Sequence, residues 1–466
     1  MIRSTTAISR LALFVFRVRG AVVICVASLS LAQMLFAAPS VLASEQELED
    51  APPPKSTRDM EGAVQRAYLV PEIRPSLFPW LSEQMQGLPA FFADAKFYMR
   101  YRSYYFRRDR TSGHLSHAWA MGGSLYYHSG WLKDLFAVEL EGFTSQPIVA
   151  PDSRFGTLLL KEPSQKAYTV LGVANGRLRY RDFLLAGYRQ KLHLPYLNQQ
   201  DNRMTPNTFE AVKFSKEDGP LRFAGGYAWK FKRRNGDDFV SFSKEVGVAK
   251  KRGAAFGNLL WEVNDDFQIG ASGFVVPDIL ATVYAEAAHD LSLPCDVELR
   301  LGAQFTHQHT VGKELLAGPG FDTWNFGLRG SASWRNAILQ LAFAITGDER
   351  RIESFYGSNP SYIVLMQRTF NQADEKALLV SLSYNFSRLG IPDLSAIANF
   401  AQGWDGVVAG RRGDAREFDF TIDYRIGRGR FESLWLRLRA SWLKEDTAPH
   451  NGTDFRVILR YELPVI

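Results

Sequence analysis

Hydrophobic and polar residues alternate with a period of two along much of the chain. In residues 297–305, apolar side chains occupy the odd-numbered positions, while the even-numbered positions hold Glu298, Arg300, Gly302 and Gln304. The same alternation recurs in residues 97–103, 339–345, 418–424, 434–442 and 455–461. This period is typical of a β-strand whose two faces meet different surroundings. The chain is therefore predicted to be all-β.

Three features favour a transmembrane β-barrel over a soluble β-sandwich, whose strands would also alternate. The segments are about ten residues long, which is the length that a tilted strand needs to cross a bilayer. Charged residues stand in the middle of the polar faces, where a water-filled lumen would solvate them. Aromatic residues end several segments, as in Tyr104-Tyr105-Phe106, Trp442 and Tyr461, which predicts interfacial girdles. Since bacterial single-chain barrels have even strand counts, we predict an antiparallel barrel of about 18 strands.

The connections between these segments alternate in length. Val173-Ala174-Asn175-Gly176 and Arg428-Gly429 are short and polar, and we predict that they form periplasmic hairpin turns. Residues 144–165, 192–206 and 347–374 are predicted to form long external loops. Connections of that length in a compact protein usually carry function.

The N-terminus has the pattern of a cleaved signal peptide, predicted to cover residues 1–43. Residues 1–19 contain four arginines and no acid, an apolar run follows, and Val41-Leu42-Ala43 offers small residues at the cleavage site. A retained membrane anchor is the alternative, but the apolar run is too short to span a bilayer comfortably. Residues 44–90 are predicted to form a partly flexible leader that includes a Pro-rich stretch, and residues 91–466 to form the barrel.

Charge and cysteine content narrow the range of functions. The whole chain carries a net charge of +6, of which the four arginines of the predicted signal peptide account for +4. The exported chain is thus close to neutral and has no dense basic tract, so we expect no nucleic-acid partner. Only Cys295 follows residue 43, so the exported chain is predicted to contain no intrachain disulfide.

Ordered motifs are spread over nearly all of the chain after the predicted signal peptide. Those of the first half are Arg102-Ser103-Tyr104-Tyr105-Phe106-Arg107-Arg108-Asp109, Ala186-Gly187-Tyr188-Arg189, Leu194-Pro195 and Asp201-Asn202-Arg203-Met204-Thr205-Pro206. Those of the second half are Tyr356-Gly357, Ser383-Tyr384-Asn385-Phe386, Pro392-Asp393-Leu394-Ser395, and Leu436-Arg437-Leu438-Arg439 with Asp454-Phe455-Arg456. In this order the motifs resemble the OprD-type outer-membrane porin family.

The resemblance implies an 18-stranded barrel with a narrow pore, constricted by loops that fold inward. It also implies substrate-selective uptake of small carboxylate-bearing molecules, such as amino acids or aromatic acids, across the outer membrane of a Gram-negative bacterium. Two positions depart from the family pattern. Asp393 stands where the family commonly has glycine, and Ile466 ends the chain where many outer-membrane barrels have an aromatic residue.

Strand alternation predicts which side chains line the lumen. The predicted channel-lining residues are Arg100, Arg102, Arg437, Arg439 and Arg456. The first and last strands of a closed barrel are neighbours, so we expect Arg456 to lie beside the two arginines of the first strand. A planar guanidinium group suits a carboxylate because it makes two parallel charge-assisted hydrogen bonds. The resemblance adds that all five positions match a basic strip of the family. Alternatively, these arginines balance lumen acids such as Asp419, Asp423 and Glu462.

Other candidate chemistry is weaker. His307 and His309 share a strand face, as two metal ligands would, but with no third ligand evident we interpret them as polar residues at a loop end, and we predict no metal and no cofactor. A barrel enzyme of the lipase or protease type and a less selective general porin remain as alternative functions. The expected partners are small carboxylate-bearing solutes, outer-membrane lipids and the barrel-assembly machinery, with the protein a monomer or a loose homotrimer.

Overall fold

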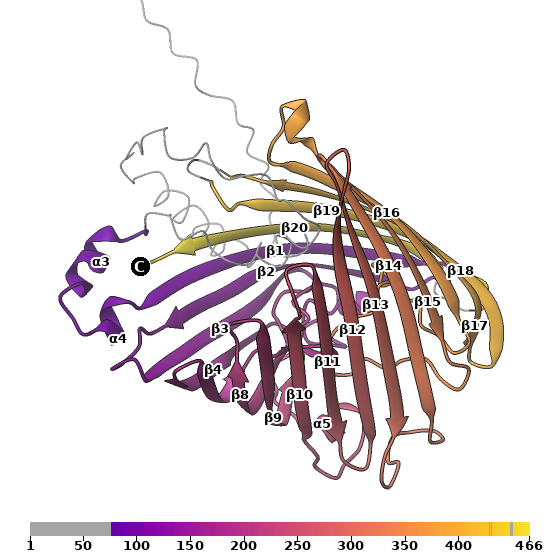
Figure 1. Ribbon diagram of the computed structural model, residues 1–466, viewed down its shortest axis with the longest axis horizontal. Helices are drawn as coiled ribbons and strands as arrows, with labels where there is room; N and C mark the ends of the chain where they lie inside the picture. Colours follow the sequence, from indigo (N-terminus) through magenta and orange to yellow (C-terminus); the bar gives the residue numbers. More distant parts are fainter. Residues whose placement is uncertain (1–75, 428, 430, 448–450) are drawn as a thin grey trace, which may run out of the picture. The chain divides into compact units, whose positions relative to one another are not determined.

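The computed structural model describes residues 76–427, 429, 431–447 and 451–466. The predicted signal peptide, residues 44–75 of the predicted leader, and Arg428 of one predicted turn lie outside the described residues. Eighteen strands form one antiparallel sheet, and the sheet closes because β1 pairs with β2 on one side and with β20 on the other (Figure 1). The predicted 18-stranded barrel is confirmed.

The barrel strands are 8 to 15 residues long, and all but the shortest reach the about 9–11 residues that a tilted strand needs to cross a bilayer. The strands are β1 (Lys96–Arg110), β2 (Leu115–His128), β3 (Phe136–Val149), β4 (Tyr168–Tyr180), β5 (Phe183–Gln190), β8 (Thr208–Lys216), β9 (Leu221–Lys232), β10 (Ala254–Glu262), β11 (Phe267–Val276), β12 (Leu280–Leu293), β13 (Val297–Thr310), β14 (Asp322–Trp334), β15 (Ala337–Thr346), β16 (Lys376–Asn385), β17 (Leu394–Val408), β18 (Arg411–Arg425), β19 (Trp435–Glu445) and β20 (Gly452–Pro464).

Short elements precede the barrel or lie in its connections. They are α3 (Pro79–Met85), α4 (Ala90–Ala93), η1 (Asp152–Arg154), β6 (His193–Leu194), β7 (Leu197–Asn198), α5 (Phe242–Glu245) and η2 (Phe386–Leu389). In the part of the chain that the structure describes, none of the helices is both long and apolar enough to span a bilayer. The β6–β7 hairpin lies in the connection between β5 and β8, where it shapes a loop that matters for the site.

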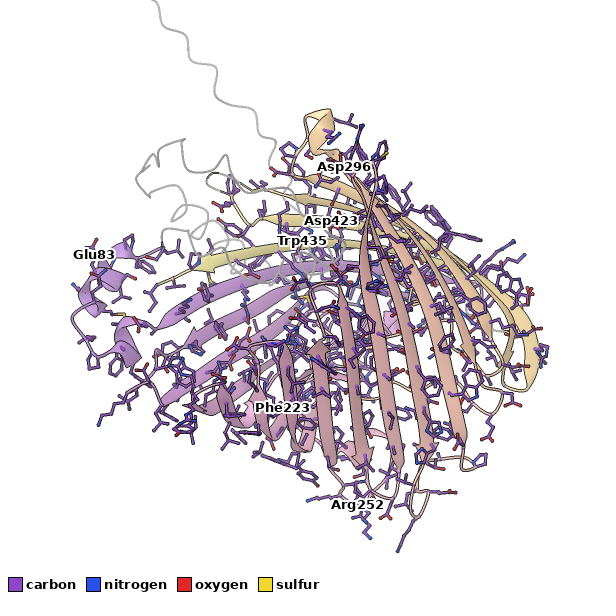
Figure 2. All side chains as sticks on the ribbon, in the orientation of Figure 1. Glu83, Phe223, Arg252, Asp296, Asp423 and Trp435 are labelled. Carbon is purple, nitrogen blue, oxygen red and sulfur yellow. The ribbon has the colours of Figure 1, made fainter. Side chains whose placement is uncertain are left out.

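The long connections lie at one end of the barrel, as predicted, but the alternation in length is incomplete, because short connections such as residues 277–279 and 409–410 lie at the same end. Figure 2 labels Arg252, in the long connection after α5, and Asp296, in a tight turn at the opposite end. The predicted loops at residues 192–206 and 347–374 are confirmed, but the loop predicted from residue 144 begins later because β3 continues to Val149. The turn predicted at residues 173–176 is wrong, since these residues lie within β4. Asn175 faces inward there and donates to a carboxylate oxygen of Glu139, so the polar lumen accommodates residues that elsewhere mark a turn.

The two faces of the strands differ as the alternation predicts, with one exception among the aromatic residues. Trp442 faces outward and is exposed, as a girdle residue should be. Tyr104 and Phe106, however, point into the barrel and are only 1% and 0% exposed, which leaves Tyr105 as the outward residue of that triplet. Of this predicted aromatic run, which lies within β1, one residue therefore faces outward and two belong to the interior core.

The interior is filled by loops that pack against the wall. Tyr356, in the connection between β15 and β16, lies with its ring centroid 4.7 Å from that of Phe242 and 5.9 Å from that of Phe231. Leu192 and Tyr196, from the connection between β5 and β8, belong to the same buried cluster. These contacts fold two long connections inward and narrow the lumen, as the family resemblance implies.

Gly123 in β2 marks a position where two strands approach too closely for a side chain. A Cβ atom there would lie 1.8 Å from the carbonyl oxygen of Arg100, and the residue has a φ of +133°. Replacing Gly123 with alanine should therefore lower the folded fraction, since overpacking of this kind costs about 1–3 kcal/mol. Gly257 is the matched control, because nothing lies within 4 Å of a Cβ atom at that position. Gel migration of unboiled samples measures the folded barrel, and equal folded fractions for the two variants would contradict the prediction.

Candidate functional site

The two ends of the barrel sequence meet where β20 pairs with both β1 and β19. In this register Arg102 lies opposite Arg460, and Arg439 lies opposite Arg456. Arg456 also lies opposite Phe106 of β1. The expectation that Arg456 adjoins the two β1 arginines is therefore wrong: the register places it further along the wall, level with Arg439. The five predicted arginines nevertheless all occupy inward positions on the three strands.

Two of the predicted arginines are balanced by acids of the wall itself. Arg100 donates to Glu141 at 3.0 Å, and its Nε atom lies 3.8 Å from a carboxylate oxygen of Glu462. Arg437 makes two hydrogen bonds to Asp423, of 2.6 and 2.9 Å. For these two side chains the alternative interpretation holds, since each neutralises an acid. Figure 2 labels Asp423 on β18.

Arg102 is held by an acid from an inward-folded loop. Its guanidinium group donates to both carboxylate oxygens of Asp201, at 2.7 and 2.8 Å. Burial acts to raise the pKa of Asp201, but the charge and hydrogen bonds of Arg102, with Arg460 and Lys191 beyond, outweigh it and hold this pKa well below its usual range. The connection between β5 and β8 is thus anchored to the basic wall by an ionised carboxylate.

Arg439 differs from its neighbours on the strip. Within the described part of the chain it makes no ion pair, and its guanidinium group donates to the hydroxyl of Thr421 at 3.2 Å. Arg456, directly opposite, donates to both carboxylate oxygens of Asp454, at 2.7 and 2.8 Å, and to the carbonyl oxygen of Met366 at 3.0 Å. The facing pair of arginines therefore contacts a single carboxylate.

Further guanidinium groups gather beside this pair, around the ring of Phe106. The Cζ atoms of Arg108, Arg203 and Arg456 lie 5.3, 5.4 and 5.0 Å from its centroid. Arg203 comes from the same loop as Asp201 and donates to the carbonyl oxygen of Thr157 at 3.0 Å. Burial, and next the charge of Arg456, lower the pKa of Arg203 well below its usual value. Positive charge is concentrated here in a way that favours an added anion.

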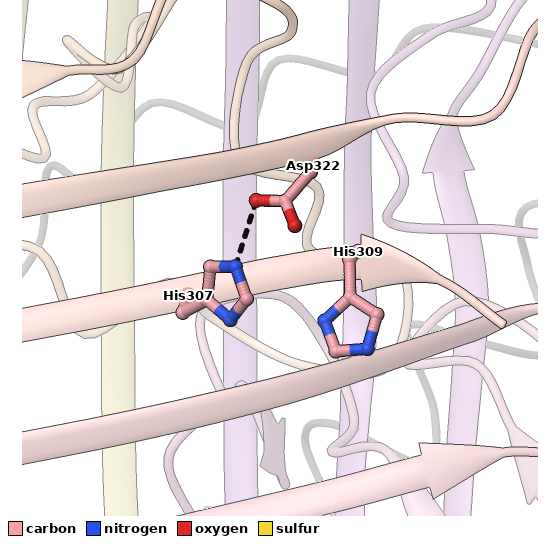
Figure 3. Close-up of side chains that lie close together, drawn as sticks. All are labelled: His307, His309 and Asp322. Carbon is pink, nitrogen blue, oxygen red and sulfur yellow. Dashed lines mark hydrogen bonds and ion pairs between the residues drawn. The ribbon is translucent and has the colours of Figure 1, made fainter.

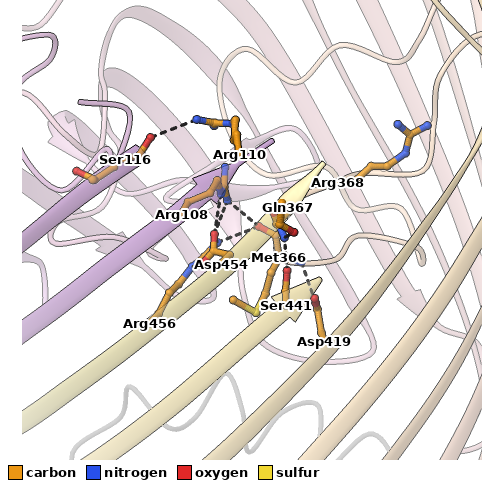
Figure 4. A network of polar contacts seen from close by, with 12 residues as sticks. Arg108, Arg110, Ser116, Met366, Gln367, Arg368, Asp419, Ser441, Asp454 and Arg456 are labelled. Carbon is orange, nitrogen blue, oxygen red and sulfur yellow. Dashed lines mark hydrogen bonds and ion pairs between the residues drawn. The ribbon is translucent and has the colours of Figure 1, made fainter. Parts of the chain in front are cut away.

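A second loop, between β15 and β16, is fixed across the strip by two buried acids of β18. The backbone N–H of Met366 donates to Asp419 at 2.9 Å, and those of Gln367 and Arg368 donate to the two carboxylate oxygens of Glu417, at 2.8 and 2.9 Å. Figure 4 shows this loop segment beside the arginines of β1 and β20. Carboxylates that accept several backbone N–H bonds make a rigid anchor, so the loop narrows the lumen at a defined level.

Two cavities flank that level. The cavity nearer the tight turns has a volume of about 210 Å³, and its charged lining residues are Arg100, Arg102, Glu141, Lys191, Asp201, Arg460 and Glu462. The cavity nearer the long loops has a volume of about 500 Å³, and its charged lining residues are Arg108, Arg110, Arg351, Glu353, Arg368 and Glu445. The second lining has twice as many basic as acidic residues, so this cavity should attract anions. On β1, Tyr104 and Phe106 lie between the residues that line the two cavities.

Comparison with known proteins assigns the chain to a family. A family model described as outer membrane porin, OprD family, matches residues 89–465. The chain belongs to the OprD family of outer membrane porins. It is accordingly a channel-forming protein of the outer membrane.

Solved structures extend the likeness to the fold of this OprD-family porin. It is similar to OccK9 (OpdG) of Pseudomonas aeruginosa, with 23% identity and a TM-score of 0.74. It is also similar to OpdK of Pseudomonas aeruginosa, solved with vanillate (23%, 0.73), and to a BenF-like porin from Pseudomonas fluorescens Pf-5 (21%, 0.75). Each comparison covers 80% of this chain and 100% of the other. A comparison with curated proteins found no match.

Sequence reasoning missed part of the basic lining of this porin. Arg108 and Arg110 share the parity of Arg100 and Arg102 on β1, and Arg460 shares that of Arg456 on β20, so strand alternation could have found these three. Four other basic residues come from loops, where no periodic pattern exists. They are Lys191, Arg203, Arg351 and Arg368.

Proposed function

We propose that this OprD-family porin passes small carboxylate-bearing nutrients, such as amino acids or aromatic and organic acids, by passive diffusion along its arginines, and that it catalyses no reaction. The observation that carries the proposal is the surplus of guanidinium groups at one level of the lumen. Arg439 makes no ion pair among the described residues, and Arg456, which faces it, shares Asp454 with Arg108. A solute carboxylate at this level would supply the missing negative charge.

The chemistry of these groups suits transient binding. A guanidinium fork binds a carboxylate through two parallel hydrogen bonds, and the pair of Arg102 and Asp201 is an example within the chain itself. Successive arginines would let a solute exchange one partner for the next without being trapped. Among the relatives, OpdK was solved with vanillate, an aromatic carboxylate, which supports the same class of solute for this porin.

Uptake into liposomes that contain the purified porin tests the proposal. Each carboxylate solute should be paired with its own neutral amide, for example benzoate with benzamide, so that size and shape stay constant while charge changes. We expect faster entry of the carboxylates. Equal entry of both members of each pair would favour the general-porin alternative, and hydrolysis of ester or peptide substrates by the same preparation would favour the enzyme alternative.

We also propose that residues 1–43 are removed on export, because their basic, apolar and small-residue sections have the order of a signal peptide. N-terminal sequencing of outer-membrane material should begin near Ser44, and a sequence that retains residues 1–20 would contradict this. Insertion by the barrel-assembly machinery, a lipid-facing surface in the outer membrane, and a monomeric or loosely trimeric state remain predictions.

A further inference from the structure

The outer face of the barrel carries a cluster of metal-binding side chains that has no part in the lumen. His307 and His309 are two residues apart on β13 and point outward, and the ring centroids lie 5.0 Å apart. Asp322, the first residue of β14, lies directly opposite His309 in the strand register. Figure 3 shows the three side chains converging. The local sequence pattern reveals only the two histidines, because the third residue, Asp322, comes from the neighbouring strand of the sheet.

Distances within the cluster are short enough for a shared ion. The Nε2 atom of His307 lies 2.7 Å from a carboxylate oxygen of Asp322. One ligand-type atom from each of the three residues lies within 4.8 Å of the other two. Ligand atoms of a four-coordinate zinc ion stand about 2.0–2.2 Å from the metal, so modest side-chain rotation would bring all three atoms to one centre.

An atom of His309 adds an independent observation. Its Nδ1 atom is buried and has no hydrogen-bond partner among the described residues. A buried polar atom without a partner requires an explanation, and a bound ion is one.

We propose that His307, His309 and Asp322 form a binding site for a divalent transition-metal ion, with zinc as the representative, on the outer face of the porin near its long-loop end. Two imidazoles and one carboxylate are a donor set that suits zinc, copper or nickel and does not suit magnesium or calcium, which prefer oxygen donors. Three protein ligands leave a position open to water or to an anion of the surrounding membrane surface.

The position of the site gives the ion a structural consequence. His309 stands one residue before the end of β13, and Asp322 begins β14, so the ion would close the base of the connection between them. The backbone N–H of Asp322 also donates to Glu349 at 2.7 Å, in the loop that narrows the lumen. Metal binding would therefore rigidify the rim at the point where that loop begins.

Calorimetric titration of the folded, tag-free porin in detergent with zinc chloride tests the site. We expect one zinc ion per chain, with no matching uptake of magnesium or calcium. His309→Ala and Asp322→Asn should each weaken zinc binding by roughly ten- to a hundredfold or more, since even residues that only orient metal ligands have effects of that size. His289→Ala is the matched control, because His289 is an exposed histidine on the outer face of β12 at the other end of the barrel.

Several outcomes would overturn the proposal. No zinc uptake by the wild-type porin would do so, as would equal binding by the wild type and both site variants, or a loss as large for His289→Ala as for His309→Ala. Migration of unboiled samples on gels shows whether each variant has folded. Asp322→Asn keeps the size of the side chain, so it serves as the test if removal of a histidine ring disturbs the strand.

Discussion

Replacing Arg439 with alanine is expected to slow carboxylate uptake by roughly tenfold, because one hydrogen bond to a charged group contributes about 1.5–3 kcal/mol and each 1.4 kcal/mol corresponds to a factor of about ten. Water in the lumen weakens this hydrogen bond, so we expect a contribution at the lower end of the range of about 1.5–3 kcal/mol. Arg439 makes no ion pair among the described residues, since its guanidinium group donates to Thr421. The nearby acid Asp419 keeps its hydrogen bond from the backbone N–H of Met366 when Arg439 is removed. Its removal should therefore change transport without harming assembly.

Two matched substitutions sharpen this test. Arg107→Ala removes an arginine from the outer face of β1, where the side chain pairs with Asp109, and should leave uptake unchanged. Arg437→Ala removes a lumen arginine that balances Asp423 and leaves that acid, among the described residues, with the hydrogen bond from Trp435 at 2.7 Å. Arg437→Ala should thus reduce the folded fraction more than Arg439→Ala does. Bilayer recordings in a salt gradient should show weaker anion preference for Arg439→Ala, and unchanged selectivity together with wild-type uptake would contradict the arginine mechanism.

The barrel and the direction of its arginines could be predicted because both follow from local alternation. A strand that presents apolar side chains to lipid must present the intervening ones to the lumen, so parity alone oriented Arg100 and Arg437. The register between neighbouring strands does not follow from local alternation, because it depends on turn lengths and on strand pairing around the whole closed barrel. The register places Arg456 of β20 opposite Arg439 of β19 and away from Arg102 of β1. This position could not be predicted from the sequence of any one of these strands.

The loops escaped prediction for a related reason. Asp201 and Arg203 are close in sequence, yet one side chain pairs with β1 while the other lies against the ring of Phe106. Nothing periodic specifies such contacts, and they arise only when the loop folds into the lumen. Polar side chains within strands can also resemble a turn in the sequence. Asn175 is a residue type common in turns, but it lies in β4 and donates to Glu139 in the barrel interior. The metal-ligand cluster likewise needed Asp322 from a second strand.

The second large effect is expected from Arg102→Ala, which should make channel conductance depend on pH. In the wild type, the pKa of Asp201 is held well below its usual range, so the ionised carboxylate anchors the loop. The pKa of an aspartate in an unfolded chain is about 3.9. A carboxyl group whose pKa is lower than this in the folded protein stabilises the fold at every pH above about 3.9, and it loses that contribution only as the pH falls through the lowered pKa. The wild-type anchor should therefore be constant from about pH 5 to 8.

Removing Arg102 reverses the balance of forces on Asp201. Burial is the largest influence on the pKa of Asp201 and raises it. Without Arg102, burial would be opposed mainly by the charges of Arg460 and Lys191. Breaking a buried pair by removing one partner typically costs about 3–5 kcal/mol, and the acid can relieve that cost by taking up a proton. The loop anchor should thus weaken, and protonation of Asp201 should move to higher pH, where recordings can follow it.

The double variant Arg102→Ala with Asp201→Asn identifies the titrating group. It lacks the arginine but has no acid at position 201, so the loop should be loosened equally at every pH. Single-channel conductance between about pH 5 and 8 should vary for Arg102→Ala and stay flat for the double variant. If both variants follow the same pH profile, another group titrates; if Arg102→Ala matches the wild type, this ion pair does not hold the loop.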